Sequence, residues 1–207
     1  MTTRRKRYHH GDLRQALLEM VDQIITRDGL PAVSLRACAR QLGVSPSAPF
    51  RHFADKRALL TAYAVSGFDQ MLAIIAQRQA NAPPDNPMRR FRAVGEGYFD
   101  FAIRHPGHFQ VMFGAVALDR DDPDLQAAEA RLSACLSGGL DGALGVSEPA
   151  AIRAQKGLLA WAVVHGLACL TVDRQLDDIL PDDPHEQRRF LLSTMAMMAP
   201  AFQRIAE

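Results

Sequence analysis

The chain has 207 residues, of which 48% are apolar, so it is long enough to bury a sizeable core. No apolar run of roughly 18 residues lacks a charge or a helix breaker, and no apolar segment follows the basic N-terminal residues. We therefore expect neither a membrane span nor a secretory signal. Three widely spaced cysteines, Cys38, Cys135 and Cys169, suit a reducing cytosol better than a disulfide framework or a zinc knuckle.

Charge is distributed unevenly along the chain, although the formal net charge is only +1. Residues 1–60 hold 11 Lys and Arg against 5 Asp and Glu, whereas the remainder holds 13 against 18. A basic N-terminal region on a mildly acidic body is typical of a protein that contacts nucleic acid at one end. The alternative is a solvated surface whose charges are uneven for no functional reason.

The first predicted helix has a single apolar stripe. Its apolar residues recur at steps of three and one from Leu13 to Ile25, which matches one face of a helix. Asp12 is a candidate N-cap, with Gln15 as its capping-box partner, and Gly29 is a candidate stop.

Two short helices are expected next. The first begins at a Ser34 cap and ends at Gly43. The second begins immediately afterwards, because Ser45 can serve as its N-cap and Pro46 fits the first helical position. This third helix should end near Phe53.

Six further helices are expected, each introduced by a capping residue, a proline or a break in the pattern. They begin at Asp55, at Asn86 and Pro87, at Phe109, at Asp121, at Ser147 and at Asp183. The total is about nine helices with no strand-like alternation, so the fold class is all-α. We expect a DNA-binding domain over residues 1–56 and a helical effector-binding and dimerisation domain over residues 57–207.

The segment from Ser34 to Phe53 has the pattern of a helix-turn-helix. Two short helices meet at a tight turn around Gly43, and the apolar residues of the first can pack against the preceding helix. The second helix presents Ser45, Ser47, Arg51 and His52, which are polar residues, on its outer side. In such motifs the second helix enters the major groove, where Arg suits guanine and Ser suits either base type.

This stretch and its flanks resemble the tetracycline-repressor (TetR) family of bacterial regulators. The matching residues are Tyr8–Leu13, Gly43–Ser45, Phe50–Phe53 and Asp55–Leu60. Further along, Trp161, His165 and Gly166 are similar to the C-terminal signature of one subset of that family. The resemblance implies a subunit of nine helices, in which helices 1–3 bind DNA and the others bind a small molecule and a second subunit.

The sequence departs from the family pattern at two positions. Phe50 stands where the family usually has a Tyr that contacts phosphate, so that contact is lost although the ring can still pack. Pro49 stands where Leu is common, at the fourth helical position. Its missing N–H removes the first intrahelical hydrogen bond, and we expect a stiffened or slightly tilted recognition helix.

Several polar and basic residues are candidates for DNA contact. Most of them have an alternative without DNA. Arg51, Ser47 and Lys56 could be solvated surface residues, His52 could be structural, and the basic N-terminal tail could serve only to increase solubility. The candidates are Arg4, Arg5, Lys6, Arg7, Ser34, Arg36, Ser45, Pro46, Ser47, Arg51, His52 and Lys56.

A second set of residues, apolar and aromatic with a few polar groups, is a candidate effector pocket. A packed core without a ligand is the alternative, and His165 is more often a hydrogen-bonded core histidine than a ligand. The set comprises Met71, Tyr98, Phe99, Phe109, Met112, Phe113, Trp161 and His165. No metal ligand set, cofactor motif or catalytic motif is recognised.

The helix that carries Trp161 has two apolar stripes. One contains Leu158, Trp161 and His165, and the other contains Leu159, Val163 and Leu170. One stripe suffices for a subunit core, so the second is expected to pack in a homodimer through the last two long helices. The sequence does not decide which stripe faces the partner.

These features predict a DNA-binding transcriptional regulator that is not an enzyme. We expect a repressor that binds double-stranded DNA at a palindromic operator, is released by a small, mostly apolar effector, and resides in the bacterial cytoplasm, on the nucleoid when bound. The alternatives are a helical enzyme, or a helical adaptor whose basic end meets an acidic protein. The operator, the effector, the regulated genes and the sign of regulation are not encoded in a form that the sequence alone reveals.

Overall fold

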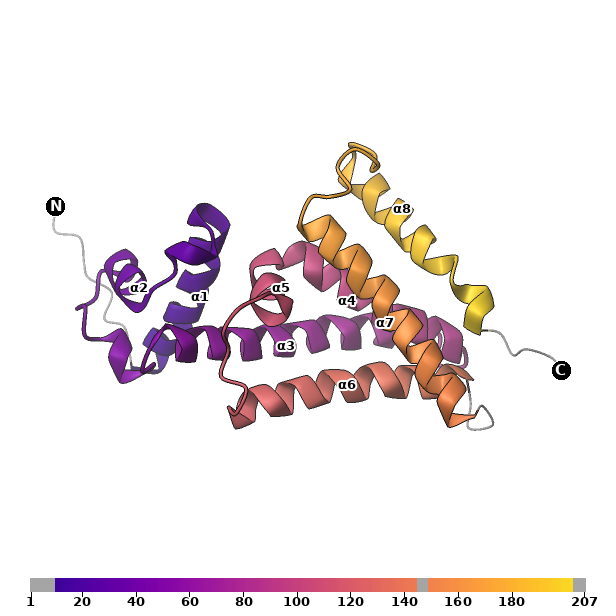
Figure 1. The fold of residues 1–207 in the computed structure, drawn as a ribbon, viewed down its shortest axis with the longest axis horizontal. Coiled ribbons are helices and arrows are strands. Elements are labelled where there is room, and N and C mark those ends of the chain that lie inside the picture. The colour runs from indigo at the N-terminus through magenta and orange to yellow at the C-terminus, as the bar shows by residue number, and fades with distance from the viewer. Residues whose placement is uncertain (1–9, 145–148, 203–207) are drawn as a thin grey trace. The chain divides into compact units, whose positions relative to one another are not determined.

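The computed structural model describes residues 10–144 and 149–202, which form helices joined by loops and turns, with no strand among them (Figure 1). The α-helices are α1 His10–Asp28, α2 Leu35–Leu42, α3 Lys56–Ala80, α4 Pro87–Arg104, α5 Pro106–Phe113, α6 Pro123–Leu144, α7 Ala150–Val172 and α8 Pro184–Ala196. Three short 3₁₀ helices accompany them: η1 Leu30–Ala32, η2 Pro49–Arg51 and η3 Ala199–Phe202. The predicted all-α fold is confirmed, with one α-helix fewer than the nine expected in the described part of the chain.

The chain divides into two compact units, which we call the N-terminal unit and the C-terminal unit. The N-terminal unit contains residues 1–67 and 107–126, and the C-terminal unit contains residues 68–106 and 127–207. Three helices contribute residues to both units: α3, α6 and, by its first residue Pro106 alone, α5. The expected domain boundary after residue 56 stays a prediction.

The core of the N-terminal unit is formed by the predicted stripe of α1. Leu17 and Val21 are fully buried, and Ile24 is nearly so. α5 joins this unit through His108, whose ring stacks on that of Tyr63 at a centroid distance of 3.8 Å. The Tyr63 hydroxyl in turn donates to Asp22 Oδ1 on α1 over 2.7 Å, and burial raises the pKa of Tyr63 far above its ordinary value.

In the C-terminal unit, α4 packs closely against both α3 and α7. Gly97 permits the contact with α3, because a Cβ at this position would lie 2.7 Å from the Ile75 Cα. Asp100, also on α4, is buried and forms ion pairs with Arg78 of α3 and Arg188 of α8. The buried Asp100 carboxylate therefore links α4 to both α3 and α8.

Two helices, α3 and α7, are long and apolar enough to cross a membrane by length and composition alone. Half of the apolar window of α3 is buried inside the protein, as in a core helix, whereas only 17% of that of α7 is buried. The absence of a span, expected from the charges that interrupt each apolar run, stays a prediction. An apolar helix that is so exposed is typical of an interaction surface.

Candidate nucleic-acid interface

Helix α2 begins and ends as the sequence predicts. The Ser34 hydroxyl accepts a hydrogen bond from the Ala37 N–H over 3.1 Å and so caps the helix. Gly43 ends it in the left-handed conformation, with φ of 67°, and the Val44 N–H reaches the Ala39 carbonyl over 3.1 Å. No side chain crowds Gly43, so its positive φ is the reason for a glycine here.

The expected third helix is not an α-helix, and this corrects the prediction from sequence. Residues 45–48 form turns, and residues 49–51 form the 3₁₀ helix η2. The Ala48, Arg51 and His52 N–H groups bond to carbonyls three residues back, at Ser45, Ala48 and Pro49. We refer to residues 45–52 as the recognition segment.

Pro49 explains why the recognition segment is not α-helical. It has no N–H for the bond to the Ser45 carbonyl, and its ring clashes with a carbonyl four residues back in an α-helix. The tighter three-residue repeat avoids the clash. Pro49 is buried, so the ring also anchors the segment to the core. The effect is larger than the slight tilt that the sequence suggested.

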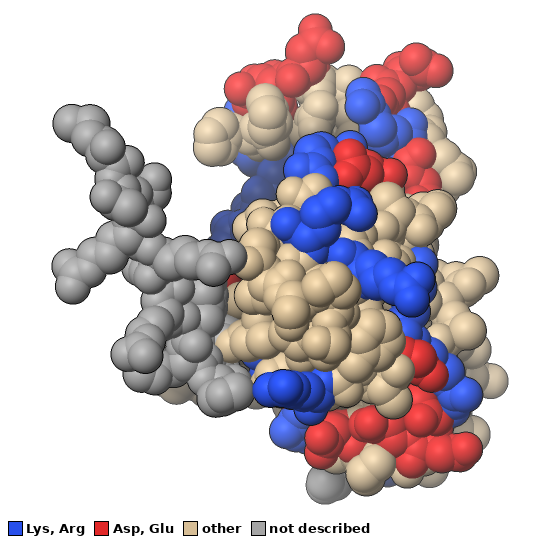
Figure 2. Space-filling model, turned by 90° about the vertical axis from the view of Figure 1, so that its left-hand side faces the viewer, with Lys and Arg blue, Asp and Glu red and all other residues tan. Residues whose placement is uncertain are grey.

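The recognition segment exposes the predicted polar side chains. Ser45, Pro46, Ser47 and Arg51 are exposed, and the Ser45 and Ser47 hydroxyl oxygens lie 3.3 Å apart. Arg36, on α2, is exposed as well. Figure 2, which looks onto the side where α2 lies in Figure 1, shows Lys and Arg side chains beside a patch of uncharged residues, with Asp and Glu side chains below the patch and near the top of the view.

These arginines are available to a partner. Among the described residues, neither Arg36 nor Arg51 forms an ion pair. By contrast, Arg57 at the start of α3 pairs with Asp119 over 2.5 Å. Unpaired guanidinium groups beside exposed hydroxyls suit both base edges and phosphates.

Two other candidates have side chains engaged within the protein, and a third, His52, is half-buried. The Ser34 hydroxyl serves as a helix cap, whereas the bond of His52 to the Pro49 carbonyl, over 2.9 Å, uses its backbone N–H and not its imidazole. Lys56 Nζ lies 3.4 Å from the Leu30 carbonyl oxygen, which leaves donors of the ammonium group for a second partner. The remaining candidates, Arg4, Arg5, Lys6 and Arg7, lie outside the described residues.

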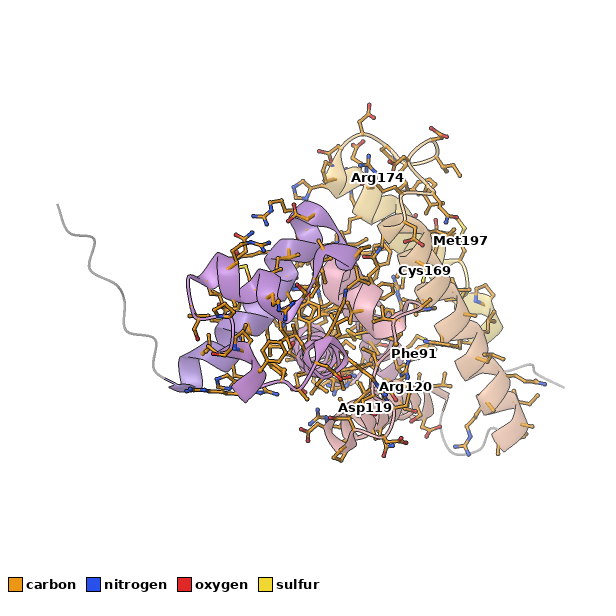
Figure 3. The ribbon with its side chains drawn as sticks, turned by 60° about the vertical axis from the view of Figure 1, so that its left-hand side comes forward. Phe91, Asp119, Arg120, Cys169, Arg174 and Met197 are labelled. Atoms are coloured by element: carbon orange, nitrogen blue, oxygen red, sulfur yellow. The ribbon has the colours of Figure 1, made fainter. Side chains whose placement is uncertain are left out.

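Three of the effector-pocket candidates come together between α4 and α7. The Tyr98 hydroxyl lies 2.8 Å from His165 Nδ1, and the Trp161 ring stacks on that of His165 at 5.2 Å. The Cys169 Sγ lies 3.5 Å from His165 Nε2, one turn along α7 (Figure 3). We call these four residues the Tyr98–His165 cluster.

Burial keeps the titratable groups of the Tyr98–His165 cluster uncharged. Burial lowers the pKa of His165 and raises that of Tyr98, which favours the neutral form of both.

The other candidates for the effector pocket are divided between the units. Met71 and Phe99 are fully buried in the C-terminal unit. Phe109, Met112 and Phe113 lie on α5 in the N-terminal unit, the first two of them buried.

Both predicted apolar stripes of α7 are partly exposed, although His165 of the first stripe is half-buried and bonds to Tyr98 of α4. Leu158 and Trp161 of one stripe are exposed, as are Leu159 and Leu170 of the other. The buried side contains Val164 and Ala168 instead, at different helical positions. Phe190 on α8 and Met197 at the end of α8 are exposed apolar residues as well. The last two long helices therefore present apolar surface that one subunit leaves uncovered.

Comparisons with known proteins agree with this arrangement. A family model described as "Bacterial regulatory proteins, tetR family" matches residues 20–63, and one described as "Tetracyclin repressor-like, C-terminal domain" matches residues 91–195. The helix-turn-helix-type transcriptional regulator Rv0681 of Mycobacterium tuberculosis (strain ATCC 25618 / H37Rv) is 27% identical over 174 residues, which are 82% of this chain and 74% of that protein. The helix-turn-helix-type transcriptional regulator YobS of Bacillus subtilis (strain 168) is 24% identical over 87% of this chain and 92% of its own.

A solved structure extends the likeness to nearly the whole chain. A protein of unknown function from Rhodococcus sp. RHA1 superposes with a TM-score of 0.75 and 29% identity, covering 95% of this chain and 96% of its own.

Proposed function

The chain belongs to the tetracycline-repressor (TetR) family of DNA-binding transcriptional regulators, and from that premise we propose that it is a cytoplasmic repressor released from a palindromic operator by a small, mostly apolar effector. Members of this family bind DNA and small-molecule effectors and form dimers, and they are not enzymes. The observation that carries the proposal is Arg51, which is exposed and forms no ion pair with any described residue, beside Ser45 and Ser47 on the segment that follows α2.

Each candidate residue has a proposed role on DNA. Arg51 binds a guanine edge, and Ser47 bonds to the base beside it. Ser45 and Pro46, at the start of the recognition segment, and Arg36 on α2 border the groove. Phosphate contacts come from Ser34, His52 and Lys56, and the basic residues 4–7 follow the minor groove or the phosphate backbone.

The proposed dimer buries the exposed apolar surface of α7 and α8 against a second copy. Ala162 and Gly166, on the same exposed side of α7, are small enough to let two helices approach closely. An isologous four-helix interface places two recognition segments about one turn of DNA apart, which is why the operator should be palindromic. Sedimentation of the protein at micromolar concentration tests this, because a monomer would be incompatible with the interface.

The proposed effector site includes the Tyr98–His165 cluster together with the buried Met71 and Phe99. Its walls are mostly apolar, and the cluster supplies a few polar groups, which suits a ligand with one or two hydrogen-bonding groups. A ligand shifts the protein off DNA only if it binds the released state more tightly. Helix α3, which begins at Lys56 and continues to Met71 and beyond, is the proposed lever.

Substitutions in the recognition segment test the DNA-binding roles. Arg51→Ala should weaken operator binding by about 1–3 kcal/mol and relax the preference at one base pair. Lys56→Ala should weaken binding to all sequences alike. It should also reduce the slope of log affinity against log salt concentration by the amount that about one phosphate contact contributes. If Arg51→Ala leaves specific binding unchanged, the recognition segment is assigned wrongly.

A further inference from the structure

One large apolar side chain stands out in the N-terminal unit. Phe50 is 48% exposed, and every other large apolar residue that is exposed in the described chain belongs to the C-terminal unit. Phe50 lies within η2, directly before Arg51. About half of the surface of this residue is therefore left uncovered.

The local backbone explains why this ring is exposed. Pro49 and Phe53, on either side of it, are both buried, and the guanidinium carbon of Arg14 lies 5.4 Å above the centre of the Phe53 ring. These two residues occupy the core side of the recognition segment. Phe50 is left exposed, as are Ser47 and Arg51 nearby in the same segment.

A phenyl ring on a DNA-facing surface has few complementary partners. It has no atom that can bond to a phosphate or to a polar base edge. The major groove presents one apolar group, the 5-methyl group of thymine, and apolar side chains recognise thymine through it. Exposed single apolar residues are common on proteins, so exposure alone does not point to this partner. The position of Phe50 next to Arg51, which has no ion-pair partner in the described part of the chain, does.

We propose that Phe50 reads the 5-methyl group of a thymine in each operator half-site. The inference rests on the proposed function, since it assumes that the recognition segment enters the major groove. Arg51 then supplies the polar contact to one base pair, and Phe50 supplies an apolar contact to a neighbouring pair. Together they would define a short purine–thymine preference within the half-site.

The test uses an operator selected by the full-length protein from random double-stranded DNA. Each symmetric pair of thymines is then replaced by deoxyuridine, which lacks only the methyl group, and Kd is measured by fluorescence anisotropy. Wild-type affinity should fall at one symmetric pair by about fourfold for each methyl lost, or about fifteenfold for both. Phe50→Ala should bind the thymine and deoxyuridine operators equally at that pair, and Phe50→Leu should keep part of the difference.

The control variant is Ile103→Ala, which removes a comparably exposed side chain (43%) from α4 in the other unit. It should retain the full methyl dependence. The proposal is overturned if no deoxyuridine pair weakens wild-type binding, if the selected half-sites contain no thymine, or if Phe50→Ala keeps the methyl dependence. Failure to select any sequence would instead overturn the proposed function itself.

Discussion

At the scale of single residues, Arg174 adopts an unusual backbone conformation at the end of α7 (Figure 3). Its φ is 58°, and among the described residues it is the one non-glycine residue with a positive φ. The Gln175 N–H reaches the Leu170 carbonyl over 2.8 Å and the Arg174 N–H reaches that of Thr171 over 3.1 Å, which is the Schellman pattern. Glycine is preferred at this position because it lacks the Cβ that opposes the left-handed conformation.

Arg174→Gly should therefore stabilise the protein, by about 0.5–1 kcal/mol, in urea unfolding at a fixed protein concentration. Arg189→Gly is the matched control. Both arginines form an exposed ion pair three residues away, Arg174 with Asp177 and Arg189 with Glu186. Arg189 lies inside α8, so its replacement should cost about 1 kcal/mol. Equal losses in the two variants would show that the conformation of Arg174 carries no strain.

His165 should make stability depend on pH. Burial lowers its pKa below the ordinary value, so below about pH 6.5 the unfolded chain binds a proton that the folded chain resists. Its contribution to stability is present above that pH and is lost as the pH falls.

The melting temperature of His165→Gln should consequently decline less than that of the wild type between about pH 7 and pH 5. The control is His185→Gln, at an exposed position on α8, whose melting temperature should decline with pH as that of the wild type does. Parallel curves for His165→Gln and the wild type would contradict this.

At the scale of helices, the predictions that held depend on residues close in sequence. The caps expected at Ser34, Asp55, Asn86 and Asp183 all accept hydrogen bonds from N–H groups three residues on. The apolar stripe of α1 is likewise a local pattern, and it is buried as expected. Such features could be predicted because each is decided within one or two turns of helix.

Other features could not be predicted because they depend on the tertiary packing. Arg188 lies 88 positions from Asp100, and Tyr98 lies 67 positions from His165. The effect of Pro49 was underestimated for a different reason. The sequence shows that Pro49 lacks an N–H. Whether the short segment then becomes a 3₁₀ helix depends on the core in which the proline ring is buried, which the sequence does not show.

The Asp100 ion pairs should make a measurable contribution to the stability of the C-terminal unit. Asp100 accepts from Arg188 Nε over 2.7 Å and from its Nη2 over 3.1 Å, and it is 3% exposed. Asp100→Asn preserves the shape but leaves two arginines without their carboxylate, so it should cost about 3 kcal/mol in urea unfolding. The control is Asp69→Asn, because Asp69 pairs with Arg131 over 2.7 Å at the surface and should contribute less than about 1 kcal/mol. Similar losses in the two variants would indicate that burial of the pair is unimportant.

At the scale of the whole molecule, the charge distribution and the helix-turn-helix pattern pointed to a DNA contact near the N-terminus, and the resemblance of residues 8–60 to the TetR pattern predicted the family. The sequence also indicated that α7 carries more apolar surface than one subunit needs, and the exposure of Leu158 and Trp161 agrees with this. It left open which stripe faces the partner, and the buried side proved to contain Val164 and Ala168, which belong to neither stripe. Helix orientation within a unit is set by all neighbouring helices, so one helix's pattern could not determine it.

The most direct test of the central claim compares two DNA duplexes of equal length and base composition. One is the palindrome selected by the protein, and the other is the same sequence scrambled. Binding to each is measured by fluorescence anisotropy at about 50 mM and 200 mM salt. The account predicts at least about a thousandfold preference for the palindrome, with both affinities falling as salt rises. Equal affinity for the two duplexes at both salt concentrations would contradict it.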